Sequence, residues 1–136
     1  MKAVWYMTRK EAREQAFVLI FEKQFREDTP DEILEYAKEI RGLEVDEYTA
    51  LVFRGVSDNC DALDEIITAN LKNWRIERVS KVALAVLRLA IYEMKFVDEV
   101  PVSVSINEAV ELCKKFAVKE DASFVNGILG SIAKAE

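Results

Sequence analysis

A cluster of basic side chains near the N-terminus is the feature of this sequence best suited to ligand binding. Arg9 and Arg13 are four residues apart, so they share one side of a helix, and Lys10 flanks them. Guanidinium groups at a helix start, beside its free backbone N–H groups, suit phosphate. The same side continues into an apolar stripe, so we expect both arginines at the edge of the core. The pattern predicts an anion site with nucleic acid as a candidate ligand, although a charge cluster is also typical of a solvated face.

Residue types elsewhere in the chain argue against catalysis. Asp31, Glu35 and Glu39 recur at helical spacing, which is typical of a solvated face. Histidine is absent, which removes the commonest general base and metal ligand. No phosphate-binding loop or dinucleotide fingerprint occurs, so we expect no cofactor and no metal. Cys60 and Cys113 lie in helical patterns and are expected to be buried free thiols of a protein in a reducing cytoplasm.

Composition bounds the class of protein. Half of the 136 residues are hydrophobic, while only two prolines and four glycines interrupt the chain, which favours helices. The net charge of −6 argues against a protein that coats nucleic acid non-specifically, but it leaves room for a local basic patch. No apolar run reaches the roughly 18–20 residues of a membrane span.

Apolar periodicity predicts an all-α fold of six or seven helices. The Thr29-Pro30-Asp31-Glu32 and Ser105-Ile106-Asn107-Glu108 runs each read as a capping box, and Asp121 reads as an N-cap. Met7 is a candidate initiator, so residues 1–7 are expected to be a disordered extension and residues 8–136 a single domain. The helices are expected at about 8–25, 29–42, 46–71, 78–96, 105–116 and 121–135.

Polar residues interrupt the two most apolar helical segments. Arg88 lies in a nearly continuous apolar run, and this run marks the central helix. A buried guanidinium needs a carboxylate, for which Glu93 and Glu108 are the candidates; a role on a partner-binding surface is the alternative. The Asn126-Gly127 pair falls in mid-helix, where glycine costs about 1 kcal/mol relative to alanine. It predicts close approach of another backbone, or else a partner surface.

Taken together, these motifs resemble one family. The run RKEAREQA at residues 9–16 resembles the R-x-x-A-R-x-x-A helix of the NusB transcription antitermination family. Further motifs of that family follow in the same order, and the match extends from residue 8 to residue 135. They are Asn73-Trp74, VLRLAIYE at 86–93, Pro101, INEAVEL at 106–112 and FVNGIL at 124–129.

The resemblance implies about seven helices arranged as two three-helix bundles packed across each other. It implies a bacterial, cytoplasmic RNA-binding factor without catalysis, in the stand-alone form of the family. Its partners would be the small ribosomal protein NusE, boxA RNA, and an RNA polymerase elongation complex with other Nus factors, notably on ribosomal RNA operons. A homodimer is left open.

The resemblance also implies functional residues. RNA-binding residues would be Arg9, Lys10 and Arg13, although Glu11 stands where the family often has a basic residue. Two aromatic residues near the last loop could stack on bases, with core packing as the alternative: Phe116 and Phe124. The partner-binding surface is expected at Tyr92, Glu93, Asn107 and Glu108. A helical protein-binding module without RNA contact is the alternative function, and a helical enzyme is a third.

Overall fold

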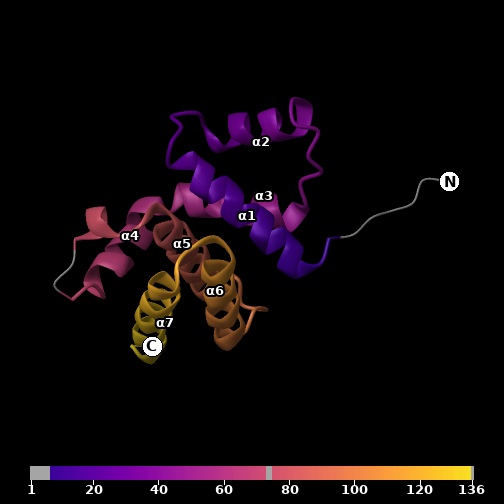
Figure 1. Ribbon diagram of the computed structural model, residues 1–136. Coiled ribbons are helices and arrows are strands. Elements are labelled where there is room, and N and C mark those ends of the chain that lie inside the picture. Colours follow the sequence, from indigo (N-terminus) through magenta and orange to yellow (C-terminus); the bar gives the residue numbers. More distant parts are fainter. Residues whose placement is uncertain (1–6, 73–74, 136) are drawn as a thin grey trace.

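The computed structural model describes residues 7–72 and 75–135, and these form seven α-helices, one short 3-10 helix and no strand. The all-α prediction is therefore confirmed over these ranges (Figure 1). The Asn73-Trp74 motif and the extension before Met7 lie outside the described residues. The elements are α1 (Arg9–Lys23), α2 (Pro30–Glu39), α3 (Glu47–Asp58), α4 (Cys60–Ala69), η1 (Ile76–Arg78), α5 (Lys81–Phe96), α6 (Val102–Phe116) and α7 (Lys119–Lys134).

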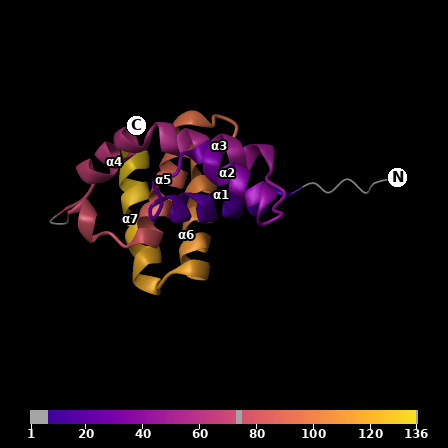
Figure 2. The same cartoon turned by 90° about the horizontal axis from the view of Figure 1, so that it is seen from above.

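The helices form two bundles that meet at α5. Helices α1, α2 and α3 contact one another, and so do α5, α6 and α7, while α4 packs on α5. Both α1 and α3 also contact α5, which lies in the middle of the molecule in both views (Figure 1, Figure 2). Ten of its residues are buried, from Ala83 to Glu93, as expected for the nearly all-apolar central helix.

Side-chain caps fix where the first two helices begin. The Thr8 hydroxyl accepts from the Glu11 N–H, and the Glu11 carboxylate accepts from the Thr8 N–H, forming a capping box. Thr29 and Glu32 form the predicted box at α2, with Pro30 in the first turn. These caps satisfy backbone N–H groups that would otherwise lack partners. The start of α1 is thus a fixed platform for the basic residues next to it.

Four predicted boundaries are wrong. Helix α5 begins at Lys81, after the Ser80 N-cap, rather than at residue 78. The long helix at 46–71 is two helices, because the chain turns at Asn59, whose side-chain amide donates to the Gly55 carbonyl at 2.8 Å. Helix α6 begins at Val102 rather than at Ser105, since Pro101 supplies the N-cap backbone geometry one turn earlier and Ser105 is buried inside the helix. Helix α7 begins before Asp121, which lies in its first turn.

The close approach expected at Gly127 occurs at Gly55 instead. A Cβ added to Gly127 would meet nothing within 4 Å, so that prediction is wrong. At Gly55 a Cβ would collide with the Tyr92 ring, and this contact lets α3 pack closely on α5. In the part of the chain that the structure describes, no helix has the length and apolar character to cross a bilayer.

Candidate nucleic-acid interface

The three basic residues at the start of α1 have different environments. Arg13 is only 3% exposed, and its Nε–H is shared between the two carboxylate oxygens of Glu93, at 2.9 and 3.0 Å. The expectation that Arg13 lies at the edge of the core is wrong, because the facing helix α5 presents a fully buried carboxylate to it. Arg13 therefore joins the two bundles.

Tyr48 on α3 completes this buried cluster. Its hydroxyl donates to Glu93 Oε2, and the Thr49 hydroxyl beside it donates to the Ala12 carbonyl at 2.9 Å. Burial, reinforced by the hydrogen bond to Glu93, raises the pKa of Tyr48 well above its usual value, so the hydroxyl remains a donor at neutral pH. We call Arg13, Tyr48 and Glu93 the buried triad; it ties α1, α3 and α5 together.

Arg9 and Lys10 are exposed, but only Lys10 has its charge neutralised. Lys10 Nζ pairs with Glu108 Oε2 of α6 at 3.0 Å. The Arg9 guanidinium lies over the Tyr48 ring, 3.8 Å from its centroid. Among the described residues, no carboxylate lies within ion-pair distance of Arg9. Of the three predicted RNA-binding residues, Arg9 is thus the one with a cation free to meet a phosphate.

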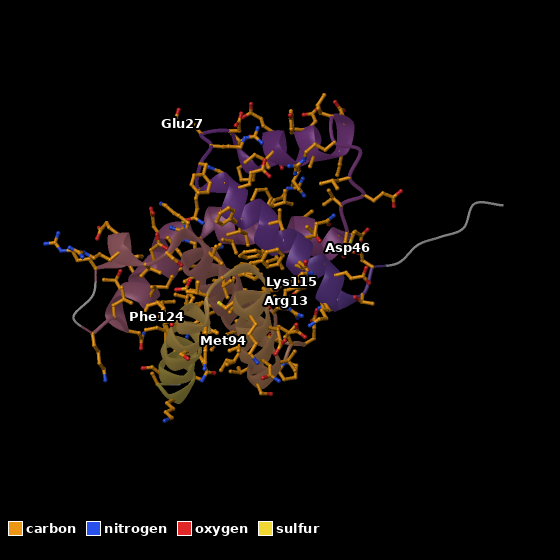
Figure 3. All side chains as sticks on the ribbon, in the orientation of Figure 1. Arg13, Glu27, Asp46, Met94, Lys115 and Phe124 are labelled. Carbon is orange, nitrogen blue, oxygen red and sulfur yellow. The ribbon has the colours of Figure 1, made fainter. Side chains whose placement is uncertain are left out.

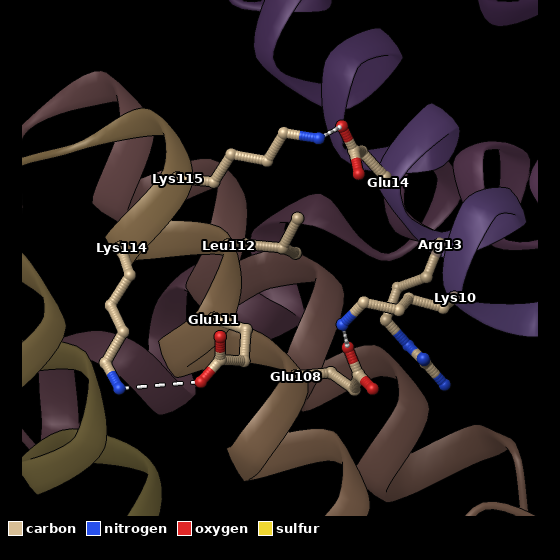
Figure 4. A pocket seen from close by; sticks show the side chains of 8 residues that line it. All are labelled: Lys10, Arg13, Glu14, Glu108, Glu111, Leu112, Lys114 and Lys115. Carbon is tan, nitrogen blue, oxygen red and sulfur yellow. Dashed lines mark hydrogen bonds and ion pairs between the residues drawn. The ribbon is translucent and has the colours of Figure 1, made fainter.

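A cavity of about 300 Å³ lies between α1 and α6, beside this cluster (Figure 4). Two ion pairs besides Lys10–Glu108 line it: Lys115–Glu14 at 2.6 Å, which links the two helices, and Lys114–Glu111 at 3.5 Å. Each lysine in the cavity therefore faces a carboxylate, and an entering phosphate must compete with that carboxylate. The complete lining is Lys10, Arg13, Glu14, Glu108, Glu111, Leu112, Lys114 and Lys115.

The two aromatic residues proposed for base stacking lie in different places. Phe116 is 39% exposed and its ring lies 5.0 Å from that of Phe17, with Lys115 Nζ 5.4 Å from the ring centroid. Phe124 is partly buried against the core. Figure 3 shows it on the α4–α7 side of the molecule, away from Arg13 and Lys115. The structure brings Phe116, and not Phe124, close to the basic residues.

The four residues expected to bind a protein partner do not form one surface. Glu93 is fully buried in the triad, so the structure does not present it to a partner. Tyr92 is also buried, and its ring stacks on Phe96 at 5.0 Å. Asn107 is exposed and Glu108 partly exposed on α6, where Glu108 holds Lys10.

An aromatic ridge that is exposed at its two ends, Phe25 and Phe116, and buried at Phe17 was missed by the sequence analysis. Successive ring centroids lie 5.2, 6.2 and 5.0 Å apart from Phe25 through Phe21 and Phe17 to Phe116. Phe25 is 62% exposed, and Val118 beyond Phe116 is 60% exposed. Phenylalanine at 17, 21 and 25 recurs every four residues, and that spacing was the available signal. Exposed apolar side chains at the two ends of this ridge are candidates for contact with another macromolecule.

Arg88 also pairs differently from expectation. Its Nε and one terminal nitrogen each donate to Asp64 of α4, both at 2.8 Å. Neither Glu93 nor Glu108 is its partner, because both face α1. The bidentate pair joins α4 to α5, which supports the structural role of Arg88 over a place on a partner-binding surface.

Comparisons with known proteins agree on one family. The NusB family model matches residues 10–134. The transcription antitermination protein NusB of Clostridium botulinum (strain Kyoto / Type A2) is 40% identical, covering 93% of this chain and 99% of that protein. NusB of Geobacillus kaustophilus (strain HTA426) is 43% identical, covering 95% and 98%.

Solved structures show the same relationship. NusB of T. maritima superposes with a TM-score of 0.84 at 32% identity, covering 96% of this chain and 93% of that one. A crystal structure of the antitermination factors NusB and NusE in complex with dsRNA superposes with a TM-score of 0.83 at 28% identity, covering 94% and 97%. With its two bundles meeting at α5 and its motifs in order, this chain belongs to the NusB family of transcription antitermination proteins.

Proposed function

We propose that this protein binds boxA RNA together with NusE in the cytoplasm and so modifies elongation by RNA polymerase, notably on ribosomal RNA operons. The observation that carries the RNA site is the exposed Arg9 guanidinium at the N-terminus of α1, held on an aromatic ring instead of paired with a carboxylate. Such a group can offer two parallel N–H donors to a phosphate, beside the positive end of the helix. The relatives above are antitermination proteins, and one related structure contains NusE and RNA.

Lys10 and Phe116 complete the proposed RNA site. Lys10 can release Glu108 and meet a neighbouring phosphate, because an exposed ion pair is worth only about 0–1 kcal/mol. Phe116 follows Lys115 of the cavity wall and exposes a ring face on which an unstacked base can lie. We assign Arg13 a structural role in this site, and Phe124 a role in packing.

NusE is proposed to bind the Phe25 end of the aromatic ridge, while Phe116 at the other end belongs to the proposed RNA site. Phe25, just beyond the end of α1, exposes apolar surface next to the partly buried Phe21, and aromatic side chains are enriched in the cores of protein interfaces. Asn107 and Glu108 of α6 stay candidates for a separate part of the partner-binding surface. The protein acts by binding and not by turnover in this proposal.

Binding of boxA RNA across a salt series, with and without NusE, tests the proposal. Removing one phosphate contact on a single strand lowers the slope of log K against log salt by about 0.7. We expect that loss for Arg9→Ala and for Lys10→Ala. Lys38→Ala on the exposed face of α2 is the matched control and should change neither slope nor affinity. Unchanged slopes for both α1 variants would place the RNA elsewhere.

The second candidate function is a protein-binding module without RNA contact. The carboxylates that neutralise Lys10 and Lys115 favour it, since they leave little net positive charge around the cavity. Under this alternative, NusE binds the wild type and Phe25→Ala weakens that binding. RNA would then fail to crosslink to the protein whether or not NusE is present.

A further inference from the structure

We propose that Tyr48 is a positioning residue for RNA binding: its ring, fixed by Glu93 and Arg13, holds the Arg9 guanidinium ready for a phosphate. This inference rests on the proposed RNA site at α1. It extends that site to α3 and α5, whose residues do not touch the ligand. The Arg9 guanidinium lies 3.8 Å from the centroid of the Tyr48 ring. The same tyrosine is held in the buried triad by Glu93, which also binds Arg13.

The ring itself is immobile. Tyr48 is only 8% exposed, and its hydroxyl is anchored on a carboxylate that Arg13 also holds. The adjacent Thr49 hydroxyl binds the Ala12 carbonyl of α1, which fixes the distance between α3 and α1 at this level. A side chain with one anchored end and buried edges keeps a single rotamer. Arg9 therefore lies on a fixed surface, although its own side chain is exposed.

Competing partners surround Arg9. A second cavity contains Arg9 and is also lined by Glu11, Glu44, Asp46 and Glu47. Glu11 is engaged in the α1 cap, and Asp46 accepts from the Tyr48 N–H. The other two are exposed, and a freely rotating arginine could pair with either of them. Contact with the Tyr48 ring keeps the guanidinium from pairing with Glu44 or Glu47 and does not neutralise its charge.

The contact with the Tyr48 ring leaves the N–H donors of the Arg9 guanidinium available to a ligand. Stacking uses the flat face of the group, whereas its N–H donors point outward in the plane. A group already ordered in the free protein loses less conformational entropy when it binds. Lys10 and Arg13, by contrast, already donate to the carboxylates of Glu108 and Glu93. The buried triad thus holds Arg9, one of the three neighbouring cations, in a conformation ready to bind a phosphate.

A double-mutant cycle on RNA binding tests this inference. We expect Tyr48→Leu to weaken binding of boxA RNA about two- to fivefold, the range that a cation–π contact at an exposed site corresponds to. In an Arg9→Ala background the same change should have no further effect. Tyr48→Phe keeps the ring but removes its anchor on Glu93, so it should lose part of the affinity, and less than Tyr48→Leu loses. Tyr36→Leu is the matched control, because the Tyr36 ring carries Arg26 at 5.2 Å on a different surface.

A second readout does not depend on RNA. In the free wild type, the ring current of Tyr48 should shift the Arg9 side-chain protons upfield in the NMR spectrum, and Tyr48→Leu should abolish the shift. Thermal unfolding of each variant checks that the fold persists, and Tyr48→Phe serves if the leucine variant unfolds. Absence of the upfield shift in the wild type overturns the inference. So does RNA binding that Arg9→Ala weakens and Tyr48→Leu leaves unchanged. A wild type that binds no RNA, with or without NusE, overturns the proposed function and the RNA role of Tyr48 with it.

Discussion

Replacing Arg13 by methionine should destabilise the fold by about 3–5 kcal/mol, the cost of breaking a buried ion pair on one side. Methionine has a similar volume, so packing is largely conserved and the charge is the variable. The Glu93 carboxylate is fully buried and would keep only the Tyr48 hydroxyl as a partner. A buried carboxylate without its cation has lost its hydration and has no ion pair to offset that loss. The desolvation free energy therefore destabilises the folded state.

Urea unfolding followed by circular dichroism measures this loss. The midpoint should fall while the m-value stays constant, because the surface exposed on unfolding is unchanged. For a domain of this size the melting temperature should fall by roughly 10–20 °C. Domains are stable by about 5–15 kcal/mol, so Arg13→Met protein is partly unfolded near physiological temperature if the wild type lies at the low end of that range. Loss of RNA binding in an Arg13 variant would then report unfolding and not a lost phosphate contact.

Removing the whole buried triad gives the decisive comparison. The triple variant Arg13→Met, Glu93→Leu and Tyr48→Phe leaves no polar group behind, so it should regain most of the lost stability. Arg54→Met is the control for a surface pair, because Arg54 and Asp31 are both exposed, and it should cost less than about 1 kcal/mol. A loss below about 1 kcal/mol for Arg13→Met, or a triple variant less stable than the single one, would refute this account of the triad.

Three further changes test packing and burial. Gly55→Ala should destabilise the protein by about 1–3 kcal/mol in urea unfolding, because its Cβ would collide with the Tyr92 ring. Gly127→Ala should stabilise it by about 0.5–1 kcal/mol, since the helix is open there, and a destabilisation would contradict the open geometry. Burial raises the pKa of Cys113 to about 11, so alkylation of the native protein at pH 8 should be slow and should become fast in urea. The pKa of Cys113 is higher in the folded than in the unfolded protein, so its contribution to folding stability is present below about pH 9 and is lost as the pH rises towards the folded pKa. Fast alkylation of the native protein would disprove the burial of Cys113.

Local signals predicted most of the helices. The Thr29 capping box and Pro30 mark the start of α2 because the cap and the proline act within one turn. The apolar run of α5 predicted a central helix for a similar reason, since a helix with no polar face must be covered on all sides. The break at Asn59 could not be read in this way. Both flanking segments share one apolar phase, and the kink depends on how each packs against α5.

The partners of the buried charges could not be predicted from the sequence. Arg13 and Glu93 are 80 positions apart, and Arg88 and Asp64 are 24 apart. Spacing along one helix says which side a residue faces, but not which carboxylate of another helix meets it. Glu93 and Glu108 were plausible partners for Arg88, yet both face α1. Residue types indicated that pairs must exist, and packing of the two bundles decided which pairs form.

The division of roles among Arg9, Lys10 and Arg13 follows from helix geometry. Lys10 points about 100° away from Arg9 and reaches α6, whereas Arg9 and Arg13 share one side one turn apart and meet α3 and α5, respectively. Each neighbouring helix offers a different group: a ring, a partly exposed carboxylate and a buried carboxylate. In a protein of net charge −6, long-range attraction to RNA is weak, so affinity depends on placing one uncompensated cation accurately. The same acidic surface disfavours RNA that does not match the site, and this combination favours selective over non-specific binding.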